Sequence, residues 1–313
     1  MIRRTKHAST ATCTLPIYMG FLMTEPNSIS CTQLAETYNI SHDSVNRFLE
    51  REDYTPHDLY QEAIQHIDNN KLIVSIDDTV LDKPYSQHMD LVSYFWSGKH
   101  HRSVKGINLI TLYATDQNGQ NIPINFRIYD KSEGKTKNDY FMDMLSEVLS
   151  WGAKIQFITG DSWYSSTGNL KTIRKHGIRF MFGIDCNRKV SPEKGQWFQL
   201  RLLPDFHQGQ VVWLKDFGFV QLFKTQLKEQ QRFYIVHQDE DDLLSFEGFH
   251  ELHSSHWKIE QYHRVIKQVC HIEKFQVRRS KLILNHIFSA LMAYVEIQKN
   301  QFERIFENVY RWQ

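Results

Sequence analysis

The sequence predicts an α/β fold in which a mixed β-sheet is flanked by helices, with a helical region before the sheet and a β-rich segment inserted into it. Residues 71–76 (KLIVSI) are β-branched and continuously apolar, which is typical of a strand buried on both faces. Residues 137–150 (KNDYFMDMLSEVLS) place their apolar side chains on one stripe, as an amphipathic helix does. Further strand-like and helix-like stretches follow in alternation, and that order indicates a sheet covered by helices.

A helical pair is predicted near the N-terminus, inside a helical region that spans residues 1–69. Residues 32–37 (TQLAET) form the first helix and residues 38–40 the turn. The second helix covers residues 42–49, with Ser41 as its N-cap. This arrangement is typical of a helix-turn-helix at about residues 31–50.

We expect the second helix of this pair to expose Ser44, Asn46 and Arg47. Side chains of these types form hydrogen bonds with phosphates and base edges in the grooves of DNA. The pattern therefore favours a DNA-binding unit, and an ordinary helical hairpin is the alternative.

The core of the predicted fold covers residues 70–189 and 248–300, and its elements follow in the order strand, strand, strand, helix, strand, helix, strand. After the strand at 71–76, they are expected at residues 101–115, 121–130, 137–150, 154–159, 167–176 and 179–185.

The stretch 190–247 has a different pattern and is predicted to be an inserted β subdomain. Its strands are expected at residues 210–214, 217–225 and 231–238, followed by a solvated turn at 239–242. Helix returns near residue 250 and continues, with breaks, into a helical tail at 301–313.

Composition excludes several classes of protein. The four cysteines (Cys13, Cys31, Cys186, Cys270) are scattered, which argues against a disulfide framework and fits a reducing cytoplasm. No apolar run reaches the length of a membrane span, and the apolar stretch 15–23 is expected to be a buried piece. The formal net charge is only +1, but the basic residues cluster at Arg3, Arg4, Lys6 and His7, at residues 99–105, and at Arg278, Arg279 and Lys281.

Two aspartates stand at corresponding places after buried strands. Asp77, with Asp78 beside it, follows the strand 71–76, and Asp161 follows the strand 154–159 after Gly160. Functional residues of open α/β sheets collect beyond the carboxyl ends of the strands. Carboxylates close together repel one another unless a cation neutralises them, and Mg²⁺ or Mn²⁺ prefers such oxygen ligands. A cap or turn role for each aspartate is the alternative.

A third carboxylate lies on a helix that carries several cationic or histidine side chains. His256, Glu260, Arg264 and Lys267 recur at spacings of three or four residues and therefore share one helical face. A glutamate beside cationic groups is what a phosphodiester site needs, and a solvated, salt-bridged helix is the alternative.

In this order on this predicted topology, Asp77, Asp161 and Glu260 resemble the catalytic residues of the DDE transposases, whose core has an RNase H-like fold. The β-rich stretch before Glu260 is similar to the insertion of the IS-four superfamily of bacterial insertion-sequence transposases. Residues 129–144 (YDKSEGKTKNDYFMDM), 160–166 (GDSWYSS) and 257–267 (WKIEQYHRVIK) also look like that group. The resemblance covers roughly residues 72–277.

One part of the family's signature differs in this chain. Around the glutamate, the family has a Tyr, an Arg and a Lys at fixed spacings; Lys267 matches the Lys, but His253 and His256 stand at the Tyr and Arg positions. Arg264 is a candidate to replace the missing guanidinium.

The resemblance implies a cut-and-paste transposase, catalytic through Asp77, Asp161 and Glu260, that holds two Mg²⁺ ions (or Mn²⁺) about 3.5–4 Å apart. Its DNA partners would be the terminal inverted repeats of the transposon and the target DNA, bound by a homodimer associated with the nucleoid. Ser44, Asn46, Arg47, His256, Arg264 and Lys267 are the expected DNA-binding residues.

The resemblance further implies an aromatic side chain that stacks on a flipped base. Trp163, Trp197 and Trp213 are the candidates, with a place in the core as the alternative for each. Two other functions stay open at this point: a metal-dependent nuclease without strand transfer, and a DNA-binding regulator whose catalytic core has decayed.

Overall fold

The computed structural model describes residues 12–25, 30–98, 100–227, 230–238 and 242–302. The basic cluster at the N-terminus (Arg3, Arg4, Lys6, His7), residues 239–241 of the predicted turn, and residues 303–313 of the predicted tail lie outside the described residues.

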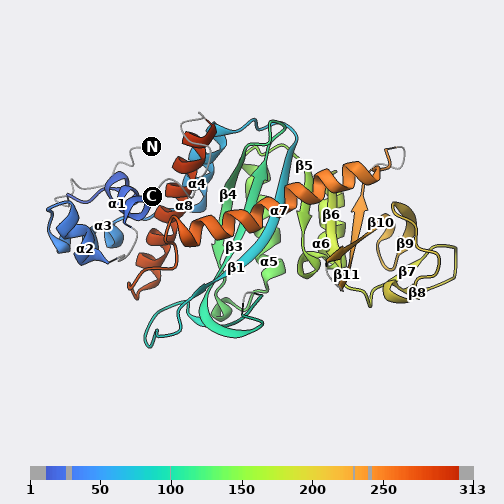
Figure 1. Cartoon of the computed structure of the whole chain (residues 1–313), viewed down its shortest axis with the longest axis horizontal. Helices are drawn as coiled ribbons and strands as arrows, with labels where there is room; N and C mark the ends of the chain where they lie inside the picture. Colours follow the sequence, from blue (N-terminus) through green and yellow to red (C-terminus); the bar gives the residue numbers. More distant parts are fainter. Residues whose placement is uncertain (1–11, 26–29, 99, 228–229, 239–241, 303–313) are drawn as a thin grey trace.

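One mixed sheet runs through the molecule (Figure 1). Its strand order is β2-β3-β1-β5-β6-β11-β10-β9-β7-β8, and β4 also pairs with β3. The strands are β1 (Leu72–Asp82), β2 (Ser93–Ser97), β3 (Arg102–Thr115), β4 (Asn121–Ile128), β5 (Ile155–Gly160), β6 (Arg179–Ile184), β7 (Lys189–Ser191), β8 (Phe198–Gln199), β9 (Gln210–Leu214), β10 (Gly218–Leu227) and β11 (Gln230–His237).

The centre of this sheet is the set β4-β3-β1-β5-β6. β1 pairs antiparallel with β3 and parallel with β5, and β5 pairs parallel with β6. The apolar run of β1 is buried on both faces because helices cover the sheet on both sides. The mixed α/β sheet flanked by helices that the sequence predicts is therefore present.

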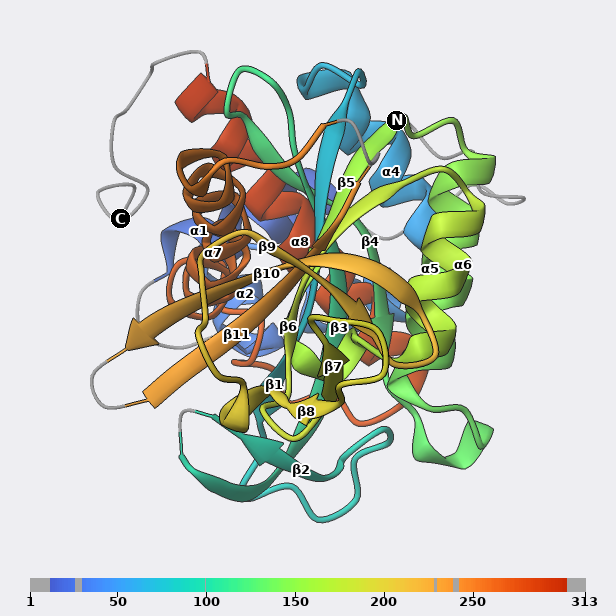
Figure 2. The same cartoon turned by 90° about the vertical axis from the view of Figure 1, so that its right-hand side faces the viewer.

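Helices α5 (Lys137–Ser150) and α6 (Thr167–Lys175) lie on one side of the sheet, and α7 (Phe246–Gln268) lies on the other (Figure 2). The boundaries of α5 are those predicted. A capping box between Thr136 and Asp139 fixes its start, and its apolar stripe packs on the sheet. The long helix α8 (Ser280–Phe302) contacts α7, β4 and the N-terminal helices.

The N-terminal helices are α1 (Leu15–Thr24), α2 (Cys31–Thr37), α3 (His42–Arg51) and α4 (Pro56–Ala63). The predicted buried piece is α1, which packs against α8. α2 and α3 form the expected helical pair, and Asn39 takes a left-handed backbone (φ 50°) in the turn between them. α3 also contacts α8, so this pair is anchored to the rest of the protein.

Several elements differ from the prediction. β1 does not end before Asp77 but continues to Asp82, because β3 pairs with it as far as Asp82 opposite Gly106. The short strands β2, β7 and β8 were not predicted, since none has a long apolar pattern. The remaining short helices are η1 (Ile64–His66), η2 (Lys131–Glu133), η3 (Ser162–Tyr164) and η4 (Leu200–Leu202).

The strands predicted within residues 190–247 are present as β9, β10 and β11. They do not form a separate sheet, because β11 pairs antiparallel with β6 and so continues the central sheet. The first half of α7 packs over this part through a small apolar cluster that includes Phe223, Tyr234 and Phe249.

Candidate active site

Strands β1 and β5 bring two of the predicted carboxylates together. The last paired residues of these parallel strands are Ile76 and Gly160, and Asp77 and Asp161 are the next residues along each chain. Paired strands lie about 4.8 Å apart, so the two aspartates are neighbours at one edge of the β1–β5 pair. Gly160 is required here, because a Cβ atom on it would lie 2.5 Å from the Phe182 ring.

Asp77 and Asp78 point to opposite faces of the sheet, because successive strand side chains alternate. Asp77 shares its face with Ser75, and this is the face that α7 crosses. The Oδ2 atom of Asp77 lies 3.6 Å from Nδ1 of His263 on α7. Asp77, and not Asp78, therefore faces the helix that carries Glu260.

Asp78 is held on the other face by three donors. Its Oδ2 atom accepts hydrogen bonds from Asn108 Nδ2 (2.6 Å) and Lys137 Nζ (2.7 Å), and its Oδ1 atom accepts one from the Tyr164 hydroxyl (2.9 Å). A carboxylate with this many partners has few lone pairs left for a metal. Asp78 thus positions β1, α5 and η3 around the site.

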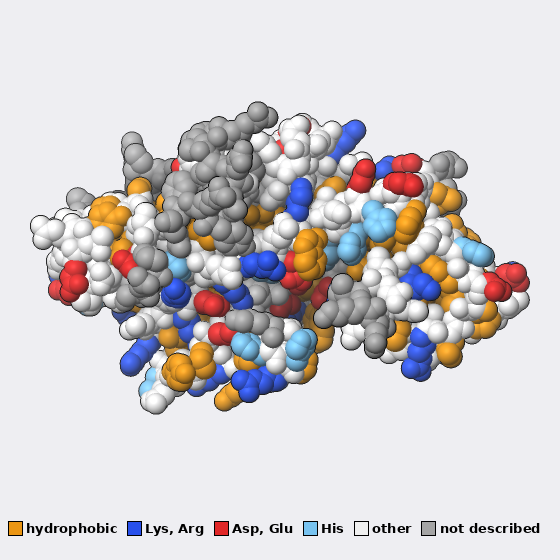
Figure 3. Space-filling view, in the orientation of Figure 1, with side chains coloured by type: hydrophobic (Ala, Val, Ile, Leu, Met, Phe, Trp, Pro, Cys, Tyr) orange, Lys and Arg blue, Asp and Glu red, His pale blue; other side chains and the backbone are white. Residues whose placement is uncertain are grey.

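Helix α7 contacts the β1–β5 edge along its length. Nδ1 of His256 lies 3.2 Å from Thr159 Oγ1, and Lys267 donates a hydrogen bond from Nζ to the carbonyl oxygen of Val80 (2.6 Å). Glu260 lies between these two contacts on the same helical face. Acidic side chains gather near the centre of this face of the molecule, with Lys and Arg side chains beside them (Figure 3).

Glu260 is exposed, and its carboxylate has no hydrogen bond or ion pair with the described part of the chain. Its negative charge nevertheless raises the pKa of Asp77. Within the described ranges, no three His, Cys, Asp or Glu side chains converge closely enough to hold a metal ion. The structure thus brings Asp77 and Asp161 together and leaves Glu260 beside them.

The two aspartates carry the electrostatic signature of a cation site. Burial, followed by the charges of Asp161, Asp78 and Glu260, raises the pKa of Asp77 well above its usual range. Burial and the charge of Asp78 raise the pKa of Asp161 to about 6. A positive charge between neighbouring carboxylates of this kind favours their ionised forms, so the donor set fits a divalent cation that takes oxygen ligands.

Two histidines on α7, His256 and His263, are neutral at pH 7. Burial lowers the pKa of His256 to about 4 and that of His263 to about 3. His256 therefore brings hydrogen-bonding capacity but no positive charge to the position at which an arginine would stand.

The family model described as "Transposase DDE domain" matches residues 68–295. The chain belongs to the DDE transposase family. Domains of this family generally depend on divalent metal ions, in agreement with the paired aspartates.

A search of curated proteins found no match to this DDE transposase. Among solved structures, it matches Argonaute of Marinitoga piezophila bound to a 5′-OH guide RNA (11% identity, 61% of this chain, 26% of that chain, TM-score 0.24). The same Argonaute with guide RNA and target DNA matches at 10% identity, over 74% of this chain and 33% of the other, with a TM-score of 0.24. The transposase chain thus spans about a third or less of the length of these proteins, and both TM-scores are too low to indicate a shared fold.

The tryptophans named as candidates for base stacking are all exposed, so the alternative of a core position is wrong for Trp163, Trp197 and Trp213. Trp163 is 62% exposed, follows Asp161 by two residues, and has Lys137 Nζ 5.6 Å from its ring centroid. Trp213 stands on β9, several strands away from β5, where it packs edge-on against Phe219. Of the three, Trp163 is the one beside the aspartates.

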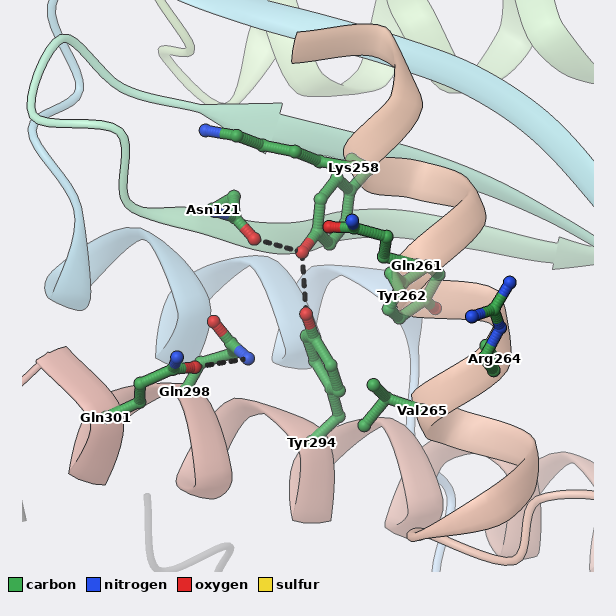
Figure 4. Close-up of a pocket in the computed structure, with 10 residues that line it drawn as sticks. Asn121, Lys258, Gln261, Tyr262, Arg264, Val265, Tyr294, Gln298 and Gln301 are labelled. Atoms are coloured by element: carbon green, nitrogen blue, oxygen red, sulfur yellow. Dashed lines mark hydrogen bonds between the residues drawn. The ribbon is translucent and has the colours of Figure 1, made fainter. Parts of the chain in front are cut away.

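Arg264 is exposed on a different flank of α7 from His263. This flank borders a cavity of about 320 Å³ between α7 and α8, which Lys258 and Gln261 also line. In Figure 4, Lys258 and Arg264 extend from α7 in different directions, with Tyr294 of α8 below them. The buried Tyr294 hydroxyl shares a hydrogen bond with that of Tyr113 (2.6 Å). The Arg264 side chain can therefore contact a ligand that approaches from solvent.

The exposure expected for Ser44 on α3 is wrong. Ser44 is 5% exposed, and its hydroxyl accepts a hydrogen bond from the backbone N–H of Cys13 (2.9 Å), which fastens α3 to the start of α1. Asn46 is half-buried, and Arg47 is exposed as expected.

Sequence reasoning missed Asn108, Lys137 and Tyr164, the three partners of Asp78. They come from three separate elements, and only the fold brings them together. Lys137 and Tyr164 did stand in two of the stretches that resemble the family, 129–144 and 160–166, and this was the available signal.

Within the described residues, no helix has both the length and the apolar character needed to cross a bilayer.

Proposed function

We propose that this chain is a cut-and-paste DNA transposase that cleaves at transposon ends and joins the freed 3′-hydroxyl to target DNA. The observation that carries the proposal is the register of β1 and β5, which makes Asp77 and Asp161 neighbours in a domain of the DDE family. The strand order β4-β3-β1-β5-β6 supports an RNase H-like core. Residues 190–247, which extend that core at β6, would be the β insertion of the IS-four-like group.

Asp77, Asp161 and Glu260 would hold the divalent cations, Mg²⁺ or Mn²⁺. Bound there, the cations would activate an attacking oxygen and stabilise the leaving oxygen of an in-line displacement. Because Glu260 is exposed and has no described partner, its side chain can reorient toward the two aspartates without breaking a contact.

Other side chains would bind and orient the DNA. Arg264 would supply the positive charge toward phosphates that the neutral His256 does not, and His256 would offer a hydrogen bond. Lys267 already donates a hydrogen bond to the Val80 carbonyl oxygen, so it would contribute to DNA binding through long-range electrostatic attraction. Trp163 would stack on an unpaired base beside the cleavage point.

The N-terminal helical pair would bind the terminal inverted repeats through the exposed part of α3. Asn46 and Arg47 are the available side chains there, whereas Ser44 is occupied by Cys13. A synaptic complex that holds both transposon ends would contain two copies of the chain.

A plasmid assay tests the proposed reaction. With a supercoiled donor that carries the inverted repeats flanking this gene, the protein and Mg²⁺ should yield both excised ends and products joined to a target plasmid. Cleaved ends without joined products would identify a nuclease. DNA binding without cleavage in either Mg²⁺ or Mn²⁺ would identify a regulator and contradict the proposal.

Metal binding should depend on pH through Asp161. The pKa of Asp161 in the folded protein is raised to about 6. Protonation of Asp161 therefore stabilises the folded state fully below the pKa that this group has in the unfolded chain, and this stabilisation is lost as the pH rises through 6. A cation should therefore stabilise the protein most above pH 7, and protons should displace it below pH 6. At a cation concentration of about 100 times Kd, the gain in unfolding free energy would be ~2.7 kcal/mol.

Thermal melts with and without Mn²⁺ at pH 5 and pH 8 measure this effect. Asp161→Asn should lose the stabilisation by Mn²⁺ at pH 8. Asp143→Asn, which changes an exposed carboxylate on α5 paired with Lys135, is the control and should keep it. An equal stabilisation of wild type and Asp161→Asn would show that the cation binds elsewhere.

A further inference from the structure

Within the described residues, a histidine beside Asp77 has no hydrogen-bond partner for either of its ring nitrogens. His263 on α7 is 6% exposed. Its Nε2 atom is buried without a partner, and its Nδ1 atom lies 3.6 Å from Asp77 Oδ2, which is beyond hydrogen-bond distance. Buried polar side chains nearly always have a hydrogen-bond partner, so one without a partner indicates a ligand that completes the site.

The carboxylate oxygen next to His263 is the one that Asp77 leaves open. Asp77 Oδ1 accepts a hydrogen bond from the backbone N–H of Asp78 (2.8 Å). Asp77 Oδ2 accepts none from any described residue. Two atoms that can each donate a lone pair, a carboxylate oxygen and a neutral imidazole nitrogen, therefore lie side by side in a largely buried position.

Contacts of α7 on both sides of His263 hold this side chain against Asp77. His256, about two turns earlier, and Lys267, about one turn later, each form a hydrogen bond with the β1–β5 edge. The buried Tyr262 ring packs beside the imidazole, with 5.2 Å between the ring centroids. The helix cannot turn His263 away from Asp77 without breaking these contacts.

The distance between the two atoms fits a shared metal ion. Two atoms that bind one ion at about 2.0–2.2 Å are about 3 Å apart when their bonds are at right angles, and at most about 4.4 Å apart. The 3.6 Å between His263 Nδ1 and Asp77 Oδ2 lies inside this range. Asp161 does not converge with these two side chains on one point in the described structure, so a bound ion would have to draw the three together.

We propose that His263 is a ligand, through Nδ1, of the divalent cation held by Asp77 and Asp161, and that the site therefore prefers Mn²⁺ to Mg²⁺. The inference rests on the proposed function, because it takes the two aspartates as cation ligands.

The chemistry of the ligands sets this preference. Imidazole nitrogen suits first-row transition ions, whereas Mg²⁺ takes oxygen ligands and keeps several waters. Mn²⁺ is a first-row ion that also takes carboxylate oxygens, so it suits a mixed set of two carboxylates and one imidazole. Loss of the imidazole should weaken binding of Mn²⁺ and leave binding of Mg²⁺ nearly unchanged.

Mn²⁺ binding to the full chain without DNA tests this ligand. Electron paramagnetic resonance gives Kd from the signal of free Mn²⁺, competition gives Kd for Mg²⁺, and the pulsed form of the method detects nitrogen bound directly to manganese. Wild type should show this nitrogen signal. His263→Phe, which keeps a buried ring, should lose the signal and bind Mn²⁺ at least about 10-fold more weakly, because loss of even an outer-shell partner costs 10- to 100-fold in metal affinity.

Two controls make the result specific. His253→Gln removes a histidine of the same helix whose Nε2 lies 3.0 Å from the Tyr234 hydroxyl, and it should keep both the nitrogen signal and the wild-type Kd. Thermal melting of metal-free His263→Phe shows whether this variant folds. If it does not, wild type grown with isotope-labelled histidine decides the question, since the label must change the nitrogen signal when a histidine binds manganese.

The outcomes separate the histidine ligand from the proposed function. Bound manganese without a nitrogen signal, or with a signal that folded His263→Phe retains, would overturn the ligand and leave the transposase proposal intact. Equal weakening of Mn²⁺ and Mg²⁺ binding by His263→Phe would overturn the preference for Mn²⁺. Nitrogen coordination in a protein that neither cuts nor joins transposon ends would support the ligand and contradict the proposed function. If wild type binds no Mn²⁺, both proposals fail.

Discussion

Asp77→Asn is expected to reduce DNA cleavage by at least about a thousand-fold, while DNA binding stays within a few-fold of wild type. The loss should exceed the 10²- to 10³-fold cost of removing one oxyanion donor, because a neutral amide at this position removes a metal ligand and with it the activation of the attacking oxygen. Cleavage rates under single-turnover conditions, with anisotropy for binding, give the two quantities.

The same substitution should not destabilise the fold. The ionised Asp77 carboxylate is buried near the charges of Asp161, Asp78 and Glu260, which raise its pKa well above the usual range. A neutral asparagine is relieved of that repulsion, so the metal-free variant should melt at or above the wild-type temperature at pH 8. Residual cleavage near the wild-type rate would mean that Asp77 is not a ligand.

Asp78→Ala should show the opposite behaviour, with a loss of about 3–5 kcal/mol in the free energy of unfolding. The substitution leaves the Lys137 ammonium and the hydroxyl of the fully buried Tyr164 without their shared acceptor. Removing one partner of a largely buried ion pair has a cost of this size. Urea denaturation measures the loss.

Asp143→Ala is the matched control for this prediction. It breaks the exposed ion pair between Asp143 of α5 and Lys135, so only a small loss of stability is expected. If Asp78→Ala were no more destabilising than Asp143→Ala, the network around Asp78 would not hold β1, α5 and η3 together.

Local signals explain which elements could be predicted from the sequence. The boundaries of α5 were predicted correctly because Thr136 and Asp139 form a capping box and the apolar stripe is regular. The end of β1 was predicted wrongly, since Asp77 and Asp78 look like the end of a strand in a one-dimensional pattern. Pairing with β3 carries the strand on to Asp82, and pairing is a property of the fold.

The candidate site was predictable in part for the same reason. Asp77, Asp161 and Glu260 stand out by their positions after strands and on a helix, but the choice between Asp77 and Asp78 depends on which face α7 covers. Ser44 was misplaced because its hydroxyl meets Cys13, some thirty residues earlier in the chain.

A crystal structure of the Mn²⁺-bound protein with transposon-end DNA at pH 8 tests the central claim most directly, because anomalous scattering locates manganese without ambiguity. We expect an anomalous peak between Asp77 and Asp161, with a Glu260 carboxylate oxygen turned in to a ligand distance of about 2.0–2.2 Å from a manganese ion. Manganese bound away from Asp77 and Asp161, or Glu260 still pointing to solvent in that complex, would contradict the account.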